Sequence, residues 1–264
     1  MKIGIFDSGL GGLIIAKAIR KAMPEYDYVY LGDTKRVPYG NRSHQTVYEF
    51  TKEGIDYLFR KENCAVVVIA CNTASARALR EIQQKYLPRN FPDRKVLGVL
   101  IPTAEESAKF RRVGVLGTPG TVSSNTFPVE IKKINKNIKI FQNPAPMLVP
   151  LAEEGEKTLA KQFIVKYLKP LLVKKPDAIV LGCTHYPIFK NEFKKLLPKS
   201  IKLISQDEIV PKKLKNYLSR HPEIEKKLTK NKKAKILITD TTKNVVKLSK
   251  KWFGDKAKPE LINL

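Results

Sequence analysis

Two motifs occur twice in this chain at nearly the same offset, and this repeat is the strongest constraint on its fold. The segment GIFDSGLGGL begins at Gly4, and the similar segment GVLGTPGTVS begins at Gly114, 110 residues later. An apolar run that ends in a cysteine also recurs, at Cys71 and 112 residues later at Cys183. Two different motifs with one offset predict two similar halves, each with a polar turn and a thiol.

Short apolar runs alternate along the chain with longer amphipathic segments. The runs that read as strands lie at residues 2–6, 28–31, 65–70, 95–99, 113–116, 138–141, 178–181, 202–204 and 235–239. Helices are predicted between most of them, for example at residues 12–23, 43–60, 73–86, 155–172 and 241–253. Strand and helix in alternation indicate an α/β protein with mostly parallel sheets and helices outside.

The repeat divides this α/β chain into two domains. We predict a first domain from residues 1–97 and 208–264, and a second from residues 98–207. The last segment is assigned to the first domain because of its length and its extra strand. The active site is then expected in the cleft between the two domains.

The composition is that of a globular protein without a membrane span. Of the 264 residues, 42% are hydrophobic, and no apolar segment approaches the roughly 20 residues that cross a bilayer. The first residues lead into a strand and do not read as a signal peptide, so we expect a soluble, cytoplasmic protein. The three cysteines, with Cys64 as a structural thiol, form no CxxC and argue against disulfides and a cysteine-rich zinc site.

The net charge of +25 is large and is concentrated toward the end of the chain. Residues 190–264 contain 20 lysines and one arginine against eight acidic residues. Such a field attracts anions and, at low salt, nucleic acid. The lysines, however, recur at helical spacing between apolar residues, which is typical of solvated helix faces. No nucleic-acid motif accompanies them, so nucleic acid is not expected as a partner.

Cys71 and Cys183 are the foremost candidates for chemistry. Each follows a predicted buried strand and precedes a predicted helix start, and ligands bind at the carboxyl ends of strands in open α/β sheets. Two thiols across one cleft can take a proton from one face of a carbon and return one to the other. A thiolate population requires a nearby cation or helix N-terminus, and the following helix supplies part of that field.

The two polar loops of the first half offer further candidates. Asp7 and Ser8 lie in a glycine-rich turn whose amides can approach a carboxylate, although Asp7 could equally cap the next helix. The turn lacks the GxGxxG spacing of a dinucleotide site. Tyr39 and Gly40, in the loop after the second strand, could offer backbone groups to a substrate or form an ordinary connection.

The second half has its own candidates. Thr118 and Thr121 occupy the counterpart of the Asp7 turn, where their hydroxyls can bind a carboxylate or cap the helix that Pro119 begins. His185 lies two residues beyond Cys183 and could tune its thiol, or be a surface histidine. Glu153 and its neighbour Glu154 are alternatives for an acid in the site.

These motifs together resemble the glutamate racemases, which are cofactor-independent enzymes that make D-glutamate for bacterial peptidoglycan. The resemblance covers nearly the whole chain. It rests on IGIFDSGLGGL, YLGDTKRVPYG, ACNTASA, VGVLGTPGTV, VPLAEEG and LGCTHYP, in the family's order and spacing. It implies two α/β domains with the active site between them, as the repeat also predicts.

The resemblance implies a role for each matched residue. Cys71 is expected to remove the proton of D-glutamate and Cys183 that of L-glutamate, with the opposite thiol as donor. Asp7 would assist Cys71, while His185 and Glu153 would assist Cys183. Asp7, His185 and seven further residues would hold the substrate: Ser8, Tyr39, Gly40, Asn72, Thr73, Thr118 and Thr184. No cofactor such as pyridoxal phosphate and no metal is expected, and a homodimer is.

One departure from the family and three alternative functions accompany this interpretation. In ISQDEIV, Ser205 stands where the family commonly has an acid, which affects the expected packing and hinge between the domains. An aspartate racemase with the same two thiols is the nearest alternative. A basic nucleic-acid-binding protein would function without the thiols, and an amino-acid-binding protein would leave both cysteines without a purpose.

Overall fold

The computed structural model describes residues 1–264 and contains two sheets in which all paired strands run parallel. The first sheet has the order β10-β9-β2-β1-β3-β4. Its strands are β1 (Lys2–Asp7), β2 (Tyr28–Gly32), β3 (Cys64–Ile69), β4 (Lys95–Gly98), β9 (Ala234–Ile238) and β10 (Pro259–Leu261). The second has the order β6-β5-β7-β8, from β5 (Arg112–Gly117), β6 (Lys139–Pro144), β7 (Ala178–Gly182) and β8 (Lys202–Ser205). The predicted α/β class is confirmed.

The order of strands repeats between the sheets. Strands β2-β1-β3-β4 of the first sheet correspond one for one to β6-β5-β7-β8 of the second, each strand being four further along the chain. The strand before each glycine-rich turn, β1 or β5, therefore pairs with the strand before each cysteine, β3 or β7. The duplication read from the motifs has a counterpart in the topology.

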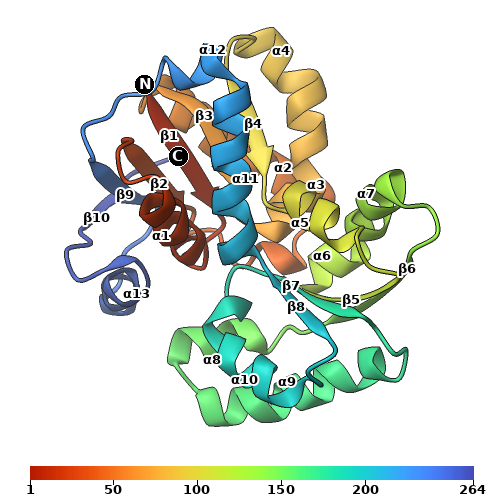
Figure 1. The fold of residues 1–264 in the computed structure, drawn as a ribbon. Coiled ribbons are helices and arrows are strands. Elements are labelled where there is room, and N and C mark those ends of the chain that lie inside the picture. The colour runs from red at the N-terminus through yellow and green to blue at the C-terminus, as the bar shows by residue number, and fades with distance from the viewer.

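Helices cover both sheets (Figure 1). They are α1 (Gly12–Ala22), α2 (His44–Arg60), α3 (Asn72–Glu81), α4 (Leu87–Asn90), α5 (Leu100–Ser107), α6 (Pro119–Ser123), α7 (Thr126–Ile134), α8 (Leu148–Glu154), α9 (Lys157–Leu172), α10 (Lys190–Leu196), α11 (Gln206–Arg220), α12 (Pro222–Glu225) and α13 (Lys243–Phe253). Two 3₁₀ turns, η1 (Tyr39–Asn41) and η3 (Tyr186–Phe189), follow β2 and β7.

The central strands are buried on both faces, which explains why they read as continuous apolar runs. All six residues of β3 are buried, and they alternate between two core clusters, with Val66 and Val68 on one face and Val67 and Ile69 on the other. The second sheet divides its core in the same way, with Ile179 and Val180 in different clusters. Each sheet is thus the middle layer of a three-layer unit.

Two predicted helices have different bounds in the structure. The helix expected from Gly155 begins at Lys157, because Gly155 has φ +81° and ends α8 in the left-handed conformation that favours glycine at a helix end. The helix expected over residues 73–86 ends its α-helical part at Glu81 and continues as a π-helical turn, Ile82–Tyr86. The sequence also left several short helices and β10 unassigned.

The end of the chain returns to its beginning. Strand β9 pairs with β2, and β10 extends the same edge, so the blue C-terminal strands lie beside the red N-terminal ones in Figure 1. Helix α11 contributes Val210, Leu214 and Leu218 to the core cluster that also holds residues of α1. The predicted domain boundaries at 97/98 and 207/208 stay a prediction. None of the helices has the length and apolarity of a membrane span.

Replacing buried Leu181 by alanine tests the double-sided burial of the second sheet. Leu181 is 0% exposed, so Leu181→Ala should lower the free energy of unfolding in urea by about 2–5 kcal/mol. The matched change Leu159→Ala, on the solvent side of α9 at 41% exposure, should cost about 1 kcal/mol or less. Equal losses for the two variants would contradict this arrangement of the core.

Candidate active site

The two thiols lie at equivalent positions of the two sheets. Cys71 follows the end of β3 by two residues, Cys183 directly follows β7, and each side chain is only 6% exposed. Cys71 also caps the N-terminus of α3, since its sulfur accepts a hydrogen bond from the amide of Ala74 at 3.4 Å. The charge of Cys183 is among the influences that raise the pKa of Cys71, so the fold brings the two sulfurs within electrostatic reach of each other.

Cys71 is held as a neutral thiol by its surroundings. Burial raises its pKa to about 12, and the negative charge of Asp7 acts in the same direction. Hydrogen bonds from the Ser8 hydroxyl, 3.2 Å from the sulfur, and from the amide of Ala74 oppose this effect. Cys71 is therefore suited to donate a proton near neutral pH, with Ser8 in place to stabilise the thiolate that results.

Asp7, whose charge acts on this thiol, is 1% exposed. One carboxylate oxygen accepts hydrogen bonds from the amide of Gly9 at 3.0 Å and the hydroxyl of Tyr30 at 3.5 Å, while the other has no partner. Burial raises the pKa of Asp7, and the charge of His185 opposes that rise. Helix α1 starts at Gly12, and the amide of Gly12 is among the groups that lower the pKa of Asp7, so the alternative interpretation of Asp7 as a helix cap stays a prediction.

Cys183 has a different set of partners. Its sulfur is 3.9 Å from Nδ1 of His185, and Nε2 of that ring is 3.0 Å from a carboxylate oxygen of Glu153 on α8. Burial lowers the pKa of His185, but the hydrogen bonds and charges of Cys183 and Glu153 outweigh it and raise the pKa to about 10. The imidazolium thus places a positive charge beside this thiol. Glu154 is exposed, so Glu153 is the acid that faces the site.

Residues from the first unit enclose His185. A Cβ at Gly11 would come within 2.5 Å of Nδ1 of His185 and of Oγ1 of Thr184. Glycine is therefore required where the turn after β1 meets the residues that follow Cys183. Trp252 of α13 contacts the imidazole edge-on, with ring centroids 5.5 Å apart. Trp252 and Tyr30 were missed by the sequence analysis, because an apolar helix face and a buried strand give no sign of a nearby site.

Threonine hydroxyls connect the two units. The Thr73 hydroxyl oxygen lies 2.9 Å from that of Thr118 and 3.3 Å from that of Thr121. Thr118 also accepts a hydrogen bond from the amide of Thr121 and so caps α6, as one of the two alternative interpretations predicted. Thr118 therefore both caps α6 and contacts Thr73, two residues after Cys71.

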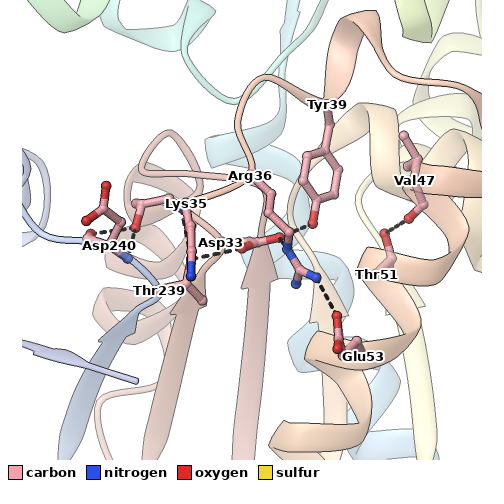
Figure 2. A network of polar contacts seen from close by, with 10 residues as sticks. Asp33, Lys35, Arg36, Tyr39, Val47, Thr51, Glu53, Thr239 and Asp240 are labelled. Atoms are coloured by element: carbon pink, nitrogen blue, oxygen red, sulfur yellow. Dashed lines mark hydrogen bonds and ion pairs between the residues drawn. The ribbon is translucent and has the colours of Figure 1, made fainter. Parts of the chain in front are cut away.

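The loop that carries Tyr39 and Gly40 is anchored to a buried acid (Figure 2). Asp33, which is 0% exposed, accepts hydrogen bonds from the hydroxyl of Tyr39 at 2.5 Å and from Nε of Arg36 at 2.6 Å. Arg36 also pairs with Glu53 of α2. Burial and the charge of Asp33 raise the pKa of Tyr39, which keeps its hydroxyl a donor. A Cβ at Gly120 would lie 2.7 Å from the carbonyl oxygen of Gly40, so this loop touches the second unit.

The same loop is fastened to the far end of the chain. Oγ1 of Thr239, at the end of β9, donates to Asp33 at 2.8 Å and accepts from the amide of Lys35 at 2.9 Å. Thr34 and Asp240 exchange two further hydrogen bonds. The loop position therefore depends on residues about 200 places away in sequence.

Asn72, beside the first thiol, pairs with a residue that the sequence analysis did not single out. Its carboxamide and that of Gln206 exchange two hydrogen bonds of 2.7 Å each. Ser205, which stands in place of the acid expected from the family, is buried and donates to Asp207 of α11 at 2.5 Å. Thr184, the last of the predicted binding residues, is buried against Gly11.

The arrangement contains two separate groups of side chains that are able to transfer a proton, one around each thiol. Cys71, Ser8 and Asp7 form one group, and Cys183, His185 and Glu153 form the other. No cluster of three or more His, Cys, Asp or Glu side chains has the grouping of a metal site.

Comparisons with known proteins show which family the chain belongs to. The family described as Asp/Glu/Hydantoin racemase matches residues 14–206. The glutamate racemase of Sulfurihydrogenibium sp. is 39% identical over 100% of this chain and 98% of its own, and that of Aquifex aeolicus is 37% identical over 99% and 97%. The crystal structure of glutamate racemase from Francisella tularensis in complex with D-glutamate superimposes with a TM-score of 0.88 at 30% identity, over 99% of this chain and 97% of that one. The chain belongs to the Asp/Glu/Hydantoin racemase family.

Proposed function

We propose that this protein is a glutamate racemase that interconverts L- and D-glutamate by proton transfer between its α-carbon and two cysteines. The observation that carries the proposal is the pair of thiols at equivalent strand ends, each with its own acid or base partners. The relatives named glutamate racemases support glutamate as the substrate.

The reaction from L- to D-glutamate begins at Cys183. Its thiolate takes the α-proton, so that an S–H bond forms as the C–H bond breaks and the electron pair stays on the α-carbon. The Cys71 thiol then gives its proton to the opposite face and becomes the thiolate. D-Glutamate reacts in reverse, with Cys71 as base and Cys183 as donor. Proton transfer by positioned side chains typically contributes about 10²–10⁴-fold to the rate.

The partners of the two thiols favour these roles. The His185 imidazolium, oriented by Glu153, donates toward the Cys183 sulfur and stabilises negative charge there. Asp7 keeps Cys71 protonated until the carbanion forms, and Ser8 stabilises the thiolate afterwards. Burial of both thiols strengthens each of these charge interactions.

The remaining residues hold the charged groups of the substrate. Hydroxyl, amide and backbone donors suit the two carboxylates, and the predicted set is Ser8, Tyr39, Gly40, Asn72, Thr73, Thr118 and Thr184. Fixed donors around a water-poor site also stabilise the developing carbanion. The proposed setting is the cytoplasm, where a homodimer of two-domain chains would supply D-glutamate for peptidoglycan.

Replacing either catalytic thiol tests the two-base reaction. In deuterated buffer the wild type should invert both isomers of glutamate and incorporate solvent deuterium. Cys71→Ser and Cys183→Ser should each slow inversion by about 10²–10⁴-fold, since one thiol serves only one face of the carbon. Cys71→Ser should still exchange the α-proton of L-glutamate without inversion, and Cys183→Ser that of D-glutamate.

The third cysteine is the control for these variants. Cys64 is buried at the start of β3, away from the strand's carboxyl end, so Cys64→Ala should keep inversion within about threefold of wild type. If the wild type prefers aspartate to glutamate, the same two-thiol reaction acts on aspartate instead. Unchanged inversion in either serine variant, or no exchange with any amino acid, would refute the proposal.

The raised pKa of His185 predicts a pH dependence of stability. The folded protein holds the imidazolium proton up to about pH 10, whereas the unfolded chain releases it near 6.5. The contribution to stability is therefore complete below about pH 6.5 and is lost as the pH rises toward 10. Urea unfolding should show a decline of up to about 4–5 kcal/mol over this range that His185→Gln lacks. His221→Gln, on the surface, should retain the wild-type decline.

Removing the negative charge of Asp33 should disturb the loop that carries Tyr39 and Gly40. Asp33→Asn retains the shape but cannot accept from Tyr39, Arg36 and Thr239 as a carboxylate does. We expect KM for glutamate to rise about tenfold in racemisation kinetics, because Tyr39 and Gly40 lose their anchor. The exposed change Glu49→Gln should leave KM within about twofold, and a wild-type KM in Asp33→Asn would contradict the role given to this loop.

A further inference from the structure

Gln206 is buried beside the first thiol loop although it belongs to a distant segment. It is the first residue of α11, is 0% exposed, and forms with Asn72 a closed amide pair in which each side chain donates once and accepts once. Asn72 stands between Cys71 and Thr73, so any change in its orientation acts directly on the site. Nothing in the proposed reaction requires Gln206 to touch the substrate.

A third residue determines which way this amide pair points. The hydroxyl of Thr103 donates to the carbonyl of Val99 at 2.6 Å, so its oxygen is left to accept. The Gln206 atom that faces Thr103, at 3.2 Å, must therefore be the nitrogen. Both N–H groups of Gln206 are then occupied, and its oxygen must accept from Asn72. The carboxamide of Asn72 is thereby held in one orientation.

The pair lies where the chain passes between the two sheets. Thr103 belongs to α5, which follows β4 of the first sheet, and Gln206 directly follows β8 of the second. Asn72 begins α3 in the first unit. The chain passes from the first sheet to the second near α5 and returns near the start of α11, and the network connects both places to Asn72, beside Cys71. The relative position of the two units is therefore linked to the orientation of the Asn72 carboxamide.

We propose that Gln206 is a positioning residue that holds the Asn72 carboxamide ready for substrate. The amide pair uses one N–H and one oxygen lone pair of Asn72 and leaves one of each. A free N–H matches the carboxylate of an α-amino acid, and a free oxygen matches its ammonium group. Without Gln206 the carboxamide can turn over and exchange these two groups. This inference rests on the proposed function.

Steady-state racemisation of glutamate by Gln206→Leu tests the proposal. The variant keeps much of the volume and removes the amide, so KM should rise about tenfold while kcat falls less, since binding in both ground and transition states is lost. Thr103→Val should raise KM about two- to fivefold, and the double variant should be no worse than Gln206→Leu, because both act through one network. The exposed change Gln45→Leu is the control and should leave KM unchanged.

The opposite result is a change in stability alone. A Gln206→Leu protein with a lower melting temperature but wild-type KM, or effects of the two single variants that simply add, would overturn the positioning role. If Gln206→Leu does not fold, the KM of Thr103→Val decides, and a wild-type value refutes the proposal.

If the wild type does not racemise glutamate, the proposed function fails separately. Neutron crystal structures of wild type and Thr103→Val, which distinguish the carboxamide nitrogen from its oxygen, then decide, and an unchanged Asn72 carboxamide refutes the inference.

Discussion

Exclusion of water from the acidic and basic groups between the two sheets is the constraint on which the rest of this structure depends. Burial raises the pKa of Asp7 and of Cys71, and only the close partners of His185 keep that ring charged. Each of these groups would have an ordinary pKa in water. The turns, loops and helices around them therefore keep a small polar region away from water.

The two halves have one topology but different chemistry. The same strand order delivers a turn and a thiol on each side, yet the first thiol has an acid and a hydroxyl as partners and the second has an imidazole and an acid. This difference gives the two thiols different electrostatic surroundings. A two-base reaction needs one donor and one acceptor at the start, so the chemical asymmetry is as necessary as the topological symmetry.

The C-terminal segment completes a site that the duplicated part begins. Thr239 fastens the loop of Tyr39, Trp252 packs on His185, and Gln206 orients Asn72. None of these residues belongs to the motifs that repeat. The part of the chain with the extra strands β9 and β10 therefore does more than extend a sheet, because Thr239, which follows β9, fastens the loop of Tyr39, and α13, which lies between β9 and β10 in sequence, carries Trp252.

The sequence alone determined the α/β class, the duplication and the residues of the two thiol loops, because these depend on local patterns: apolar runs of strand length, glycine turns and motif spacing. It also placed Cys71 and Cys183 at strand ends, which follows from parallel connectivity. It did not distinguish Glu153 from Glu154, and it placed a helix start at Gly155 where α8 ends. Only the tertiary structure brought Trp252, Gln206 and Thr239 to the site and set the pKa of His185, since contacts between distant segments and burial are properties of packing that no local pattern encodes.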